Sequence, residues 1–198
     1  MDVFIFKINF NNEVTTMSCG NAIYAGSFNP FHAGHLNIIQ RAEKYFDKLT
    51  ILIAVNPNKN YVVSALERKN QIESIISKLK WRNSTPKVDI LGKDEFIANY
   101  AADNECKTII KGLRNGEDLE SEMSQEYYNK TINPWLETMY FSTDPNMKYL
   151  SSSAVRKFTA MEEVDFIRYM KKVNFMSDLS IEDNETYLKT IYKSYKNG

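Results

Sequence analysis

The chain has 198 residues, a length that fits one globular domain with an appendage. Apolar residues make up 43% of it and charged residues 25%, with only 7 glycines and 5 prolines, which excludes a disordered or collagen-like chain. Lysine plus arginine equal aspartate plus glutamate at 25 each, so no net charge draws the protein to nucleic acid or to an anionic membrane, and any anion site must be built locally.

The first twenty residues show the alternation of a strand. Side chains at every second position are apolar, namely Phe4, Phe6, Ile8 and Phe10. Asn11 and Asn12 can turn the chain, and residues 14–17 can return as a second strand. We therefore expect residues 1–20 to form a β-hairpin extension that packs against the rest of the protein or assists its assembly.

The sequence carries no pattern typical of export. The N-terminal stretch has Asp2 and no basic region, so it does not read as a signal peptide. The longest strongly apolar run, residues 51–55, is far shorter than the roughly 20 residues that cross a bilayer. Cys19 and Cys106 have neither CxxC nor metal-site spacing, so we expect reduced thiols and a cytoplasmic protein with no membrane partner.

Between residues 21 and 160, short apolar runs alternate with longer segments of helical periodicity. The apolar runs are residues 22–24, 49–55, 88–91, 108–110 and 138–141. Two helical stripes lie between them, one of Leu36, Ile39, Ala42 and Phe46 and one of Leu66, Ile72, Ile75, Ile76 and Leu79. Strands that alternate with helices predict an α/β domain with a Rossmann-like, doubly wound, parallel five-stranded sheet and helices on both faces. Ligands are then expected at the carboxyl ends of the strands.

Beyond residue 160 the apolar spacing is helical. One cluster is formed by Phe166, Ile167 and Met170, and another by Tyr187, Leu188, Ile191 and Tyr192. We expect residues 161–198 to form a C-terminal helical segment packed on the α/β domain.

The segment GSFNPFHAGH, residues 26–35, follows the first strand of the α/β domain and opens its first helix. Gly26 permits a tight turn, and Gly34 permits close backbone approach where the unpaired N–H groups of a helix start attract anions. His32 and His35 are the only histidines in the chain, and beside these glycines they predict a phosphate site; two capping or solvated imidazoles are the alternative. No GxGxxG or GxxxxGK[ST] occurs, and the histidines lack a third metal ligand at useful spacing.

Three further places offer groups for phosphate. KGLR, residues 111–114, follows the fourth strand of the domain, so both cations reach the same sheet edge as the first motif. SSSAVR, residues 151–156, opens a helix with three hydroxyls, and an ordinary serine N-cap is the alternative. Lys59 follows the second strand, where an exposed lysine is usually only solvated.

These residues resemble a known family. GSFNPFHAGH and SSSAVR are similar to the two signature motifs of the nucleotidyltransferase superfamily. The stretch KGLRNGEDLESEMSQEYYNKTINPWLETMYF, residues 111–141, is similar throughout to the corresponding region of bacterial phosphopantetheine adenylyltransferases. The resemblance covers roughly residues 22–158 and leaves both ends of the chain outside it.

The resemblance implies an enzyme of coenzyme A biosynthesis that transfers the AMP part of ATP to 4′-phosphopantetheine, with dephospho-coenzyme A and pyrophosphate as products. The acceptor phosphate attacks the α-phosphorus of ATP in line, with no covalent enzyme intermediate. Mg²⁺ is implied as a partner of the phosphates, with no metal ligands from the protein. The resemblance also implies a homo-oligomer, a hexamer.

Matching positions in the motifs imply individual roles. The implied catalytic residues are His35, which stabilises the charge growing on the ATP phosphates, and Lys59 and Lys111, which bind the attacking phosphate. Ser27 is implied to hold that phosphate against the α-phosphate, and Ile97 to contact the pantetheine arm. The implied ATP-binding residues are Ser27, Phe28, His32, His35, Gly112, Leu113, Arg114, Glu122, Ser151, Ser152 and Ser153.

Three positions depart from the family pattern and leave alternatives open. His32 stands where bacterial phosphopantetheine enzymes usually have Thr, and Asn29 where they usually have Asp. This version is more similar to nicotinate or nicotinamide mononucleotide adenylyltransferases. Lys111 stands where the family usually has Arg, so a point charge replaces a bidentate fork. The alternatives are a mononucleotide adenylyltransferase and a nucleotide-binding regulator that has lost catalysis.

Overall fold

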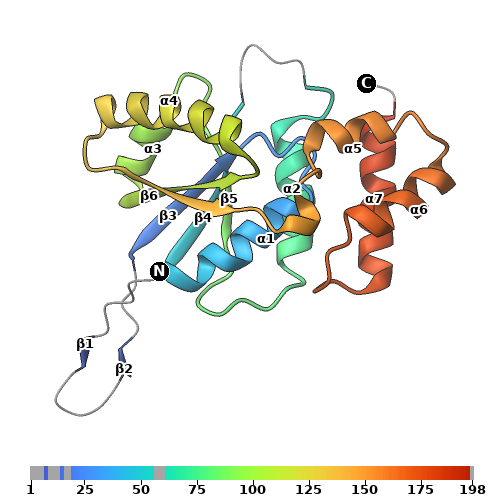
Figure 1. The fold of residues 1–198 in the computed structure, drawn as a ribbon, viewed down its shortest axis with the longest axis horizontal. Helices are drawn as coiled ribbons and strands as arrows, with labels where there is room; N and C mark the ends of the chain where they lie inside the picture. Colours follow the sequence, from blue (N-terminus) through green and yellow to red (C-terminus); the bar gives the residue numbers. More distant parts are fainter. Residues whose placement is uncertain (1–6, 9–13, 16–18, 56–60, 197–198) are drawn as a thin grey trace.

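The fold is that of a computed structural model, which describes residues 7–8, 14–15, 19–55 and 61–196 (Figure 1). Five parallel strands form one sheet in the order β5-β4-β3-β6-β7. Their bounds are β3 Asn21–Gly26, β4 Lys48–Ile53, β5 Lys87–Ile90, β6 Cys106–Leu113 and β7 Glu137–Ser142. The chain builds outward from β3 to β5 and then returns to place β6 on the other side of β3. The carboxyl ends of β3 and β6 therefore form a topological switch point, where open α/β sheets bind ligands.

Helices cover both faces of this sheet, as predicted. In chain order they are α1 Ala33–Ala42, α2 Ala65–Ile76, α3 Ile97–Asp103, α4 Gly116–Ile132, α5 Ser152–Phe158, α6 Glu163–Val173 and α7 Ile181–Tyr195, with 3-10 turns η1 Glu43–Tyr45 and η2 Pro145–Met147. Alternate residues of β3 enter two separate cores. Ala22 and Tyr24 join the core of α1, α2, α6 and α7, while Ile23 and Ala25 join that of α3. α4 packs beside α3 on this second face.

The second predicted stripe is wrong at one position. Leu66 is 62% exposed, because it precedes Ile72 by six residues and so lies about 120° around the helix from it. The inward position one turn before Ile72 belongs to Arg68, which is only 1% exposed. A buried arginine thus occupies a place where periodicity predicts an apolar side chain, and its bonds hold the site described below.

The N-terminal residues that the structure describes form a small sheet of their own. β1 Lys7–Ile8 and β2 Val14–Thr15 pair antiparallel, with Lys7 opposite Thr15 and Ile8 opposite Val14. The remainder of the predicted hairpin, including its turn, lies outside the described residues. The division of the chain at residues 20 and 160 stays a prediction.

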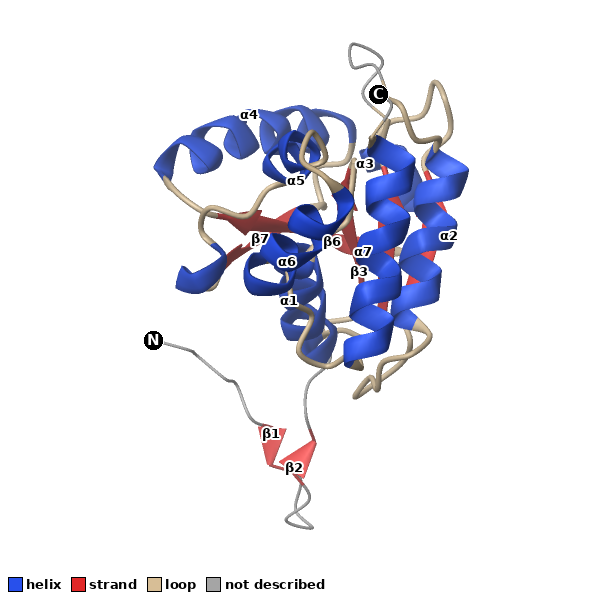
Figure 2. Ribbon diagram, turned by 90° about the vertical axis from the view of Figure 1, so that its right-hand side faces the viewer, coloured by secondary structure: helices blue, strands red, loops and turns tan. Residues whose placement is uncertain are grey.

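The C-terminal residues fold as helices, in line with their apolar spacing. α7 runs alongside α2 (Figure 2), and the buried side chains of Phe166, Met170, Leu188 and Ile191 extend the larger core. Among the described helices, none has both the length and the apolar character that a bilayer crossing requires.

Replacing Phe166 with Ala tests this packing. The ring is fully buried and lies 5.3 Å from the ring of Tyr192 between centroids. Its removal leaves a cavity, so we expect the free energy of unfolding to fall by about 3–5 kcal/mol in urea denaturation. Val164→Ala, on the same helix at a residue 67% exposed, is the control and is expected to change it by less than about 0.5 kcal/mol. Equal effects of the two substitutions would contradict a core role for α6.

Candidate active site

A cavity of about 260 Å³ opens at the carboxyl ends of β3 and β6. Its walls come from the end of each strand, the loop after β3, the first two turns of α1 and α4, and the start of α5. Nine residues predicted from the sequence line it: Phe28, His32, His35, Lys111, Gly112, Arg114, Glu122, Ser151 and Ser152. The two sequence motifs and the cationic stretch therefore meet at one place, although they are far apart in the chain.

The loop between β3 and α1, residues 27–32, is held in a strained conformation. Phe28 has a φ of +45°, a backbone angle that residues other than glycine rarely adopt, and its ring is buried. A Cβ atom on Gly26 would lie 3.0 Å from this ring, so glycine is needed there to admit Phe28. In the same way, a Cβ on Gly34 would lie 3.1 Å from the imidazole of His32. Both glycines serve close packing, and the turn itself is made by Phe28.

The carbonyl groups of this loop are paired by side chains from other elements. Arg68 on α2 donates to the Ser27 carbonyl, and Arg156 on α5 donates to that of Asn29. The Ser152 hydroxyl donates to the Pro30 carbonyl at 2.8 Å. Because an unpaired buried carbonyl costs about 1–3 kcal/mol, these donors fix the path of the loop.

The two histidines form a stacked pair at the start of α1. Their ring centroids lie 3.6 Å apart, and the His35 Nδ1 accepts the backbone N–H of His32 at 3.2 Å. Burial, aided by the charge of Arg114, lowers the pKa of His35 to about 3 and lowers that of His32 as well. His35 is therefore neutral, with its proton on Nε2. It caps the helix start, which confirms the capping alternative for this residue, and its remaining N–H leaves the phosphate role as a prediction.

The backbone at the start of α1 offers a second donor. Gly34 lines the cavity, and its N–H has no acceptor among the described residues. An N–H at a helix N-terminus carries part of the positive end of the helix dipole. A phosphate oxygen at this place would receive donors from a neutral ring and from a peptide group.

Two cations lie across the cavity, each held by an acidic side chain of α4. The Lys111 Nζ lies 2.7 Å from a Glu122 carboxylate oxygen and 3.0 Å from the Gln125 side-chain oxygen. Arg114 donates two hydrogen bonds to Asp118, both of 2.9 Å, which lower the pKa of that carboxyl group. Lys111 is only 9% exposed, so it is not a lysine solvated at the sheet edge.

These pairs also bear on metal binding. The carboxylates that line the cavity, Asp118 and Glu122, are both engaged with cations. Within the described ranges, no cluster of three or more His, Cys, Asp or Glu side chains has the arrangement of a metal site. The residues present thus suit a divalent ion that arrives with a phosphate ligand better than one held by the protein alone.

The three serine hydroxyls of residues 151–153 all form hydrogen bonds within the protein. The Ser151 hydroxyl caps α5 by accepting the N–H of Ala154 at 3.1 Å, so the N-cap alternative is confirmed for this residue. The Ser152 hydroxyl donates to the Pro30 carbonyl, and the Ser153 hydroxyl accepts a hydrogen bond from Arg156 at 3.1 Å. The hydroxyls therefore shape the site, and the backbone N–H groups of the turn are what it can offer to a phosphate.

Several predicted residues lie elsewhere. Ser27, Leu113 and Ser153 adjoin the cavity in the chain but lie outside its lining, and Ile97 begins α3 beside the smaller core. Lys59 falls outside the residues that the structure describes.

Other residues of the site were missed. Tyr24 and Asp118 line the cavity. Asp118 follows Arg114 by four residues, the spacing of an ion pair on a helix, so charge patterning could have found it. Tyr24 looks like any apolar strand residue in the sequence. Burial and the nearby Glu122 carboxylate raise its pKa, so its hydroxyl stays protonated.

Comparisons with known proteins show which family the chain resembles. The cytidylyltransferase-like family model matches residues 23–158. Among curated proteins, the phosphopantetheine adenylyltransferase of Clostridium tetani is 36% identical over 136 residues, which is 69% of this chain and 81% of that protein. The phosphopantetheine adenylyltransferase of Streptococcus suis is 38% identical over 141 residues, which is 71% of this chain and 84% of that protein.

Solved structures of similar fold come from other adenylyltransferases. A bifunctional NMN adenylyltransferase/ADP ribose pyrophosphatase from Francisella tularensis matches 90% of this chain with a TM-score of 0.60 at 18% identity, and this chain spans only 52% of it. A nicotinic acid mononucleotide adenylyltransferase from Plasmodium falciparum matches 88% of this chain and 97% of its own, with a TM-score of 0.57 at 16% identity. At these identities the likeness shows the fold alone.

The neutrality of His35 can be measured directly. The chain has only two histidines, so NMR of the imidazole nitrogens is easily assigned. We expect the His35 ring to stay neutral down to about pH 4 and the pKa of His32 also to lie below the value near 6.5 of an unperturbed histidine. The folded pKa is lower than the unfolded one, so unfolding takes up protons and the free energy of unfolding falls as the pH drops from 6.5 toward 3. His35→Asn should weaken this loss, and a His35 titration near pH 6.5 would contradict the arrangement.

Proposed function

This chain belongs to the cytidylyltransferase-like family and, within it, to the phosphopantetheine adenylyltransferases; from that premise we propose that it transfers the AMP part of ATP to 4′-phosphopantetheine and releases dephospho-coenzyme A and pyrophosphate. The observation that carries the proposal is the meeting of both motifs and the 111–114 cations around one cavity at the switch point of the sheet. The proposed reaction brings four phosphate groups to this cavity, three of ATP and one of the acceptor.

The proposed reaction needs no covalent bond between the protein and either substrate. An oxygen of the acceptor phosphate attacks the α-phosphorus, and the bond from that phosphorus to the bridging oxygen of pyrophosphate breaks. Catalysis then rests on holding the two phosphates in line and on stabilising the charge that moves to the leaving group. The His35 Nε2–H and the Gly34 N–H supply donors for that charge, and Arg114 supplies a cation. Mg²⁺, proposed as the divalent ion, would neutralise further phosphate charge while held by the ATP oxygens.

Lys111 is the proposed partner of the acceptor phosphate. Its side chain is only 11% exposed and its ammonium group faces Glu122 and Gln125, so little water has to leave it when a phosphate enters. The acceptor must exchange with or join this ion pair, which ties phosphate binding to the position of α4. Ser27, Lys59 and Ile97 stay proposed contacts of the acceptor, and Phe28, Leu113 and the 151–153 turn stay proposed contacts of ATP.

A second candidate function has a specific observation in its favour. His32 stacks on His35 in the HAGH sequence, and that motif is more similar to mononucleotide adenylyltransferases. We rank transfer to nicotinate or nicotinamide mononucleotide second. The curated relatives given above are phosphopantetheine adenylyltransferases, and this chain matches them over most of their length.

We also propose that the chain works as a homo-oligomer, a hexamer, in the cytoplasm. No residue of α4 is buried, and its large apolar side chains are exposed: Leu119, Met123, Tyr127, Tyr128 and Ile132. Aromatic and methionine side chains gathered on one helix are typical of the core of an interface, so α4 is the face that we assign to a second copy. Cys19 and Cys106 are unpaired thiols, in keeping with a reducing compartment.

One assay decides the acceptor. The protein is incubated with ATP and Mg²⁺ and with 4′-phosphopantetheine, nicotinamide mononucleotide, nicotinate mononucleotide or no acceptor, and pyrophosphate release is followed. We expect release above the no-acceptor control with phosphopantetheine only. Turnover of a mononucleotide alone would overturn the proposal in favour of the second candidate. ATP binding with no pyrophosphate from any acceptor would overturn it in favour of a regulator.

Two substitutions of Lys111 test whether acceptor binding needs its positive charge or the exact shape of its side chain. Hydrogen bonds to charged groups contribute about 1.5–3 kcal/mol, so Lys111→Ala should lower kcat/KM for the acceptor by about 10- to 100-fold while the KM for ATP changes little. Lys111→Arg keeps the cation and should retain most activity. Lys107→Ala, which removes an exposed lysine from the other end of β6, is the matched control and should behave like wild type. If Lys111→Ala also behaves like wild type, the acceptor phosphate binds elsewhere.

The α4 face can be tested by changing its charge. Met123 and Tyr127 are 57% and 72% exposed, one turn apart, so lysines at both should disrupt an interface without disturbing a core. In sedimentation velocity we expect the wild type to be oligomeric and the Met123→Lys/Tyr127→Lys variant to be smaller. Val164→Lys, at a residue 67% exposed on α6, is expected to leave assembly unchanged. A monomeric wild type would contradict self-association.

A further inference from the structure

The C-terminal helices reach the loop that carries the histidines. The Tyr195 hydroxyl donates to the Asn29 side-chain oxygen, and the Tyr187 hydroxyl donates to the Phe31 carbonyl, each at 2.7 Å. The Asn174 side-chain oxygen accepts the N–H of Ala33, also at 2.7 Å. These bonds join residues that are 166, 156 and 141 positions apart in the chain. All three donors or acceptors come from beyond residue 158, where the family model ends.

These contacts lie in the protein interior. Tyr195, Tyr187 and Asn174 are 4%, 8% and 1% exposed, and Asn29 is 7% exposed. Hydrogen bonds in such surroundings are costly to leave unmade, so the loop cannot easily move away from the helices. Together with Arg68, Ser152 and Arg156, the tyrosines bind a loop whose Phe28 has an unfavourable φ.

Asn174 acts on the helix start itself. The first N–H groups of a helix have no partner within it, and Ala33 provides the first of them in α1. Asn174 accepts that N–H, and the next one, from Gly34 in the cavity lining, has no acceptor among the described residues. The C-terminal segment thus pairs the backbone donor next to the one that the site can use.

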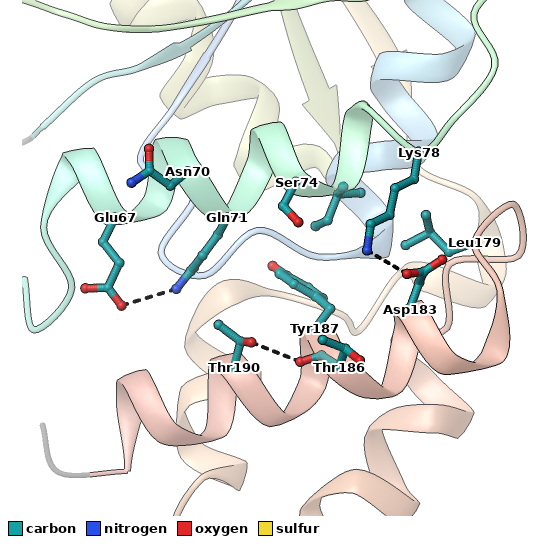
Figure 3. A pocket seen from close by; sticks show the side chains of 11 residues that line it. Glu67, Asn70, Gln71, Ser74, Lys78, Leu179, Asp183, Thr186, Tyr187 and Thr190 are labelled. Carbon is teal, nitrogen blue, oxygen red and sulfur yellow. Dashed lines mark hydrogen bonds and ion pairs between the residues drawn. The ribbon is translucent and has the colours of Figure 1, made fainter.

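The segment that makes these contacts is itself firmly built. The Asn184 side chain on α7 accepts the N–H of Met176 at 2.9 Å and donates to the carbonyls of Met176, Leu179 and Ser180, which fixes the connection between α6 and α7. Lys78, two residues after the end of α2, forms an ion pair with Asp183 of α7 at 2.6 Å (Figure 3). Tyr187 lies on the same face of α7 as this contact (Figure 3). The helices therefore form a rigid support, which is what precise placement of a catalytic group requires.

We propose that the C-terminal helices are a positioning element of the active site, in which Tyr195 and Tyr187 act as positioning residues that hold the 27–32 loop, and with it His32 and His35, in the geometry needed for adenylyl transfer. The inference rests on the proposed function for its kinetic readout only. The placement of the histidines can be read without any substrate.

The test is Tyr195→Phe, which removes one hydroxyl and keeps the ring. The matched control is Tyr192→Phe on the same helix, where an equally buried tyrosine donates to the Met161 carbonyl at 3.0 Å, away from the loop. Because small misplacements of a catalytic group are costly, we expect Tyr195→Phe to lower kcat by about 10- to 100-fold with the KM for ATP changed less than about threefold. The control should keep kcat, although both variants lose similar thermal stability.

A second readout is the NMR spectrum of the two imidazoles in the protein without ligands. We expect the resonances of His32 and His35 to shift in Tyr195→Phe and in Tyr187→Phe and to stay in place in Tyr192→Phe. Shifts without activity toward phosphopantetheine in the wild type would uphold the positioning role and overturn the proposed acceptor. Identical spectra and equal kcat for Tyr195→Phe and Tyr192→Phe would overturn the positioning role. If Tyr195→Phe does not fold, Tyr187→Phe decides by the same criteria.

Discussion

The loop between β3 and α1 places its peptide groups in the protein interior, and the rest of the site depends on how those groups are paired. Phe28 needs a left-handed backbone, and its ring fills the space that Gly26 leaves. Carbonyl groups along the loop then find donors on α2, α5 and α7. Since each element provides at least one bond, the loop is fixed from three directions. The position of the loop in turn fixes the positions of His32, its last residue, and of His35 in the first turn of α1.

The charged side chains of the site are balanced by nearby partners of opposite charge. The chain has no net charge, so no long-range field gathers phosphates. In the cavity, Lys111 and Arg114 are each matched by a carboxylate of α4, and burial keeps His35 neutral. The site thus presents neutral N–H donors beside two paired cations, of which Lys111 is buried and Arg114 is partly exposed. Such donors suit charge that develops during a reaction, because they need no reorganisation when it appears.

Local patterns in the sequence predicted the sheet and the position of the site. Apolar runs such as 49–55 form strands wherever the chain buries them, and the carboxyl ends of parallel strands share one edge, so the motifs after β3 and β6 had to meet. The buried guanidinium of Arg68 was not predictable, because it occupies an apolar stripe and one of its acceptors, the Ser27 carbonyl, lies 41 residues away in the chain. The same is true of Tyr187 and Tyr195, whose spacing predicts a buried helix face whatever their hydroxyl groups bind. The bond from the Ser152 hydroxyl to the Pro30 carbonyl was not predictable either, because only the fold brings these two residues together.

The most direct measurement is a crystal structure of the protein with a non-hydrolysable ATP analogue and Mg²⁺. A pre-organised loop predicts that the backbone of residues 27–33 stays within about 1 Å of its position without ligand, with the bonds from Tyr187 and Tyr195 intact. The phosphates should lie against the His35 Nε2 and the Gly34 N–H, on the side of Arg114. A nucleotide bound outside this cavity, or a loop released from both tyrosines when it binds, would contradict the account.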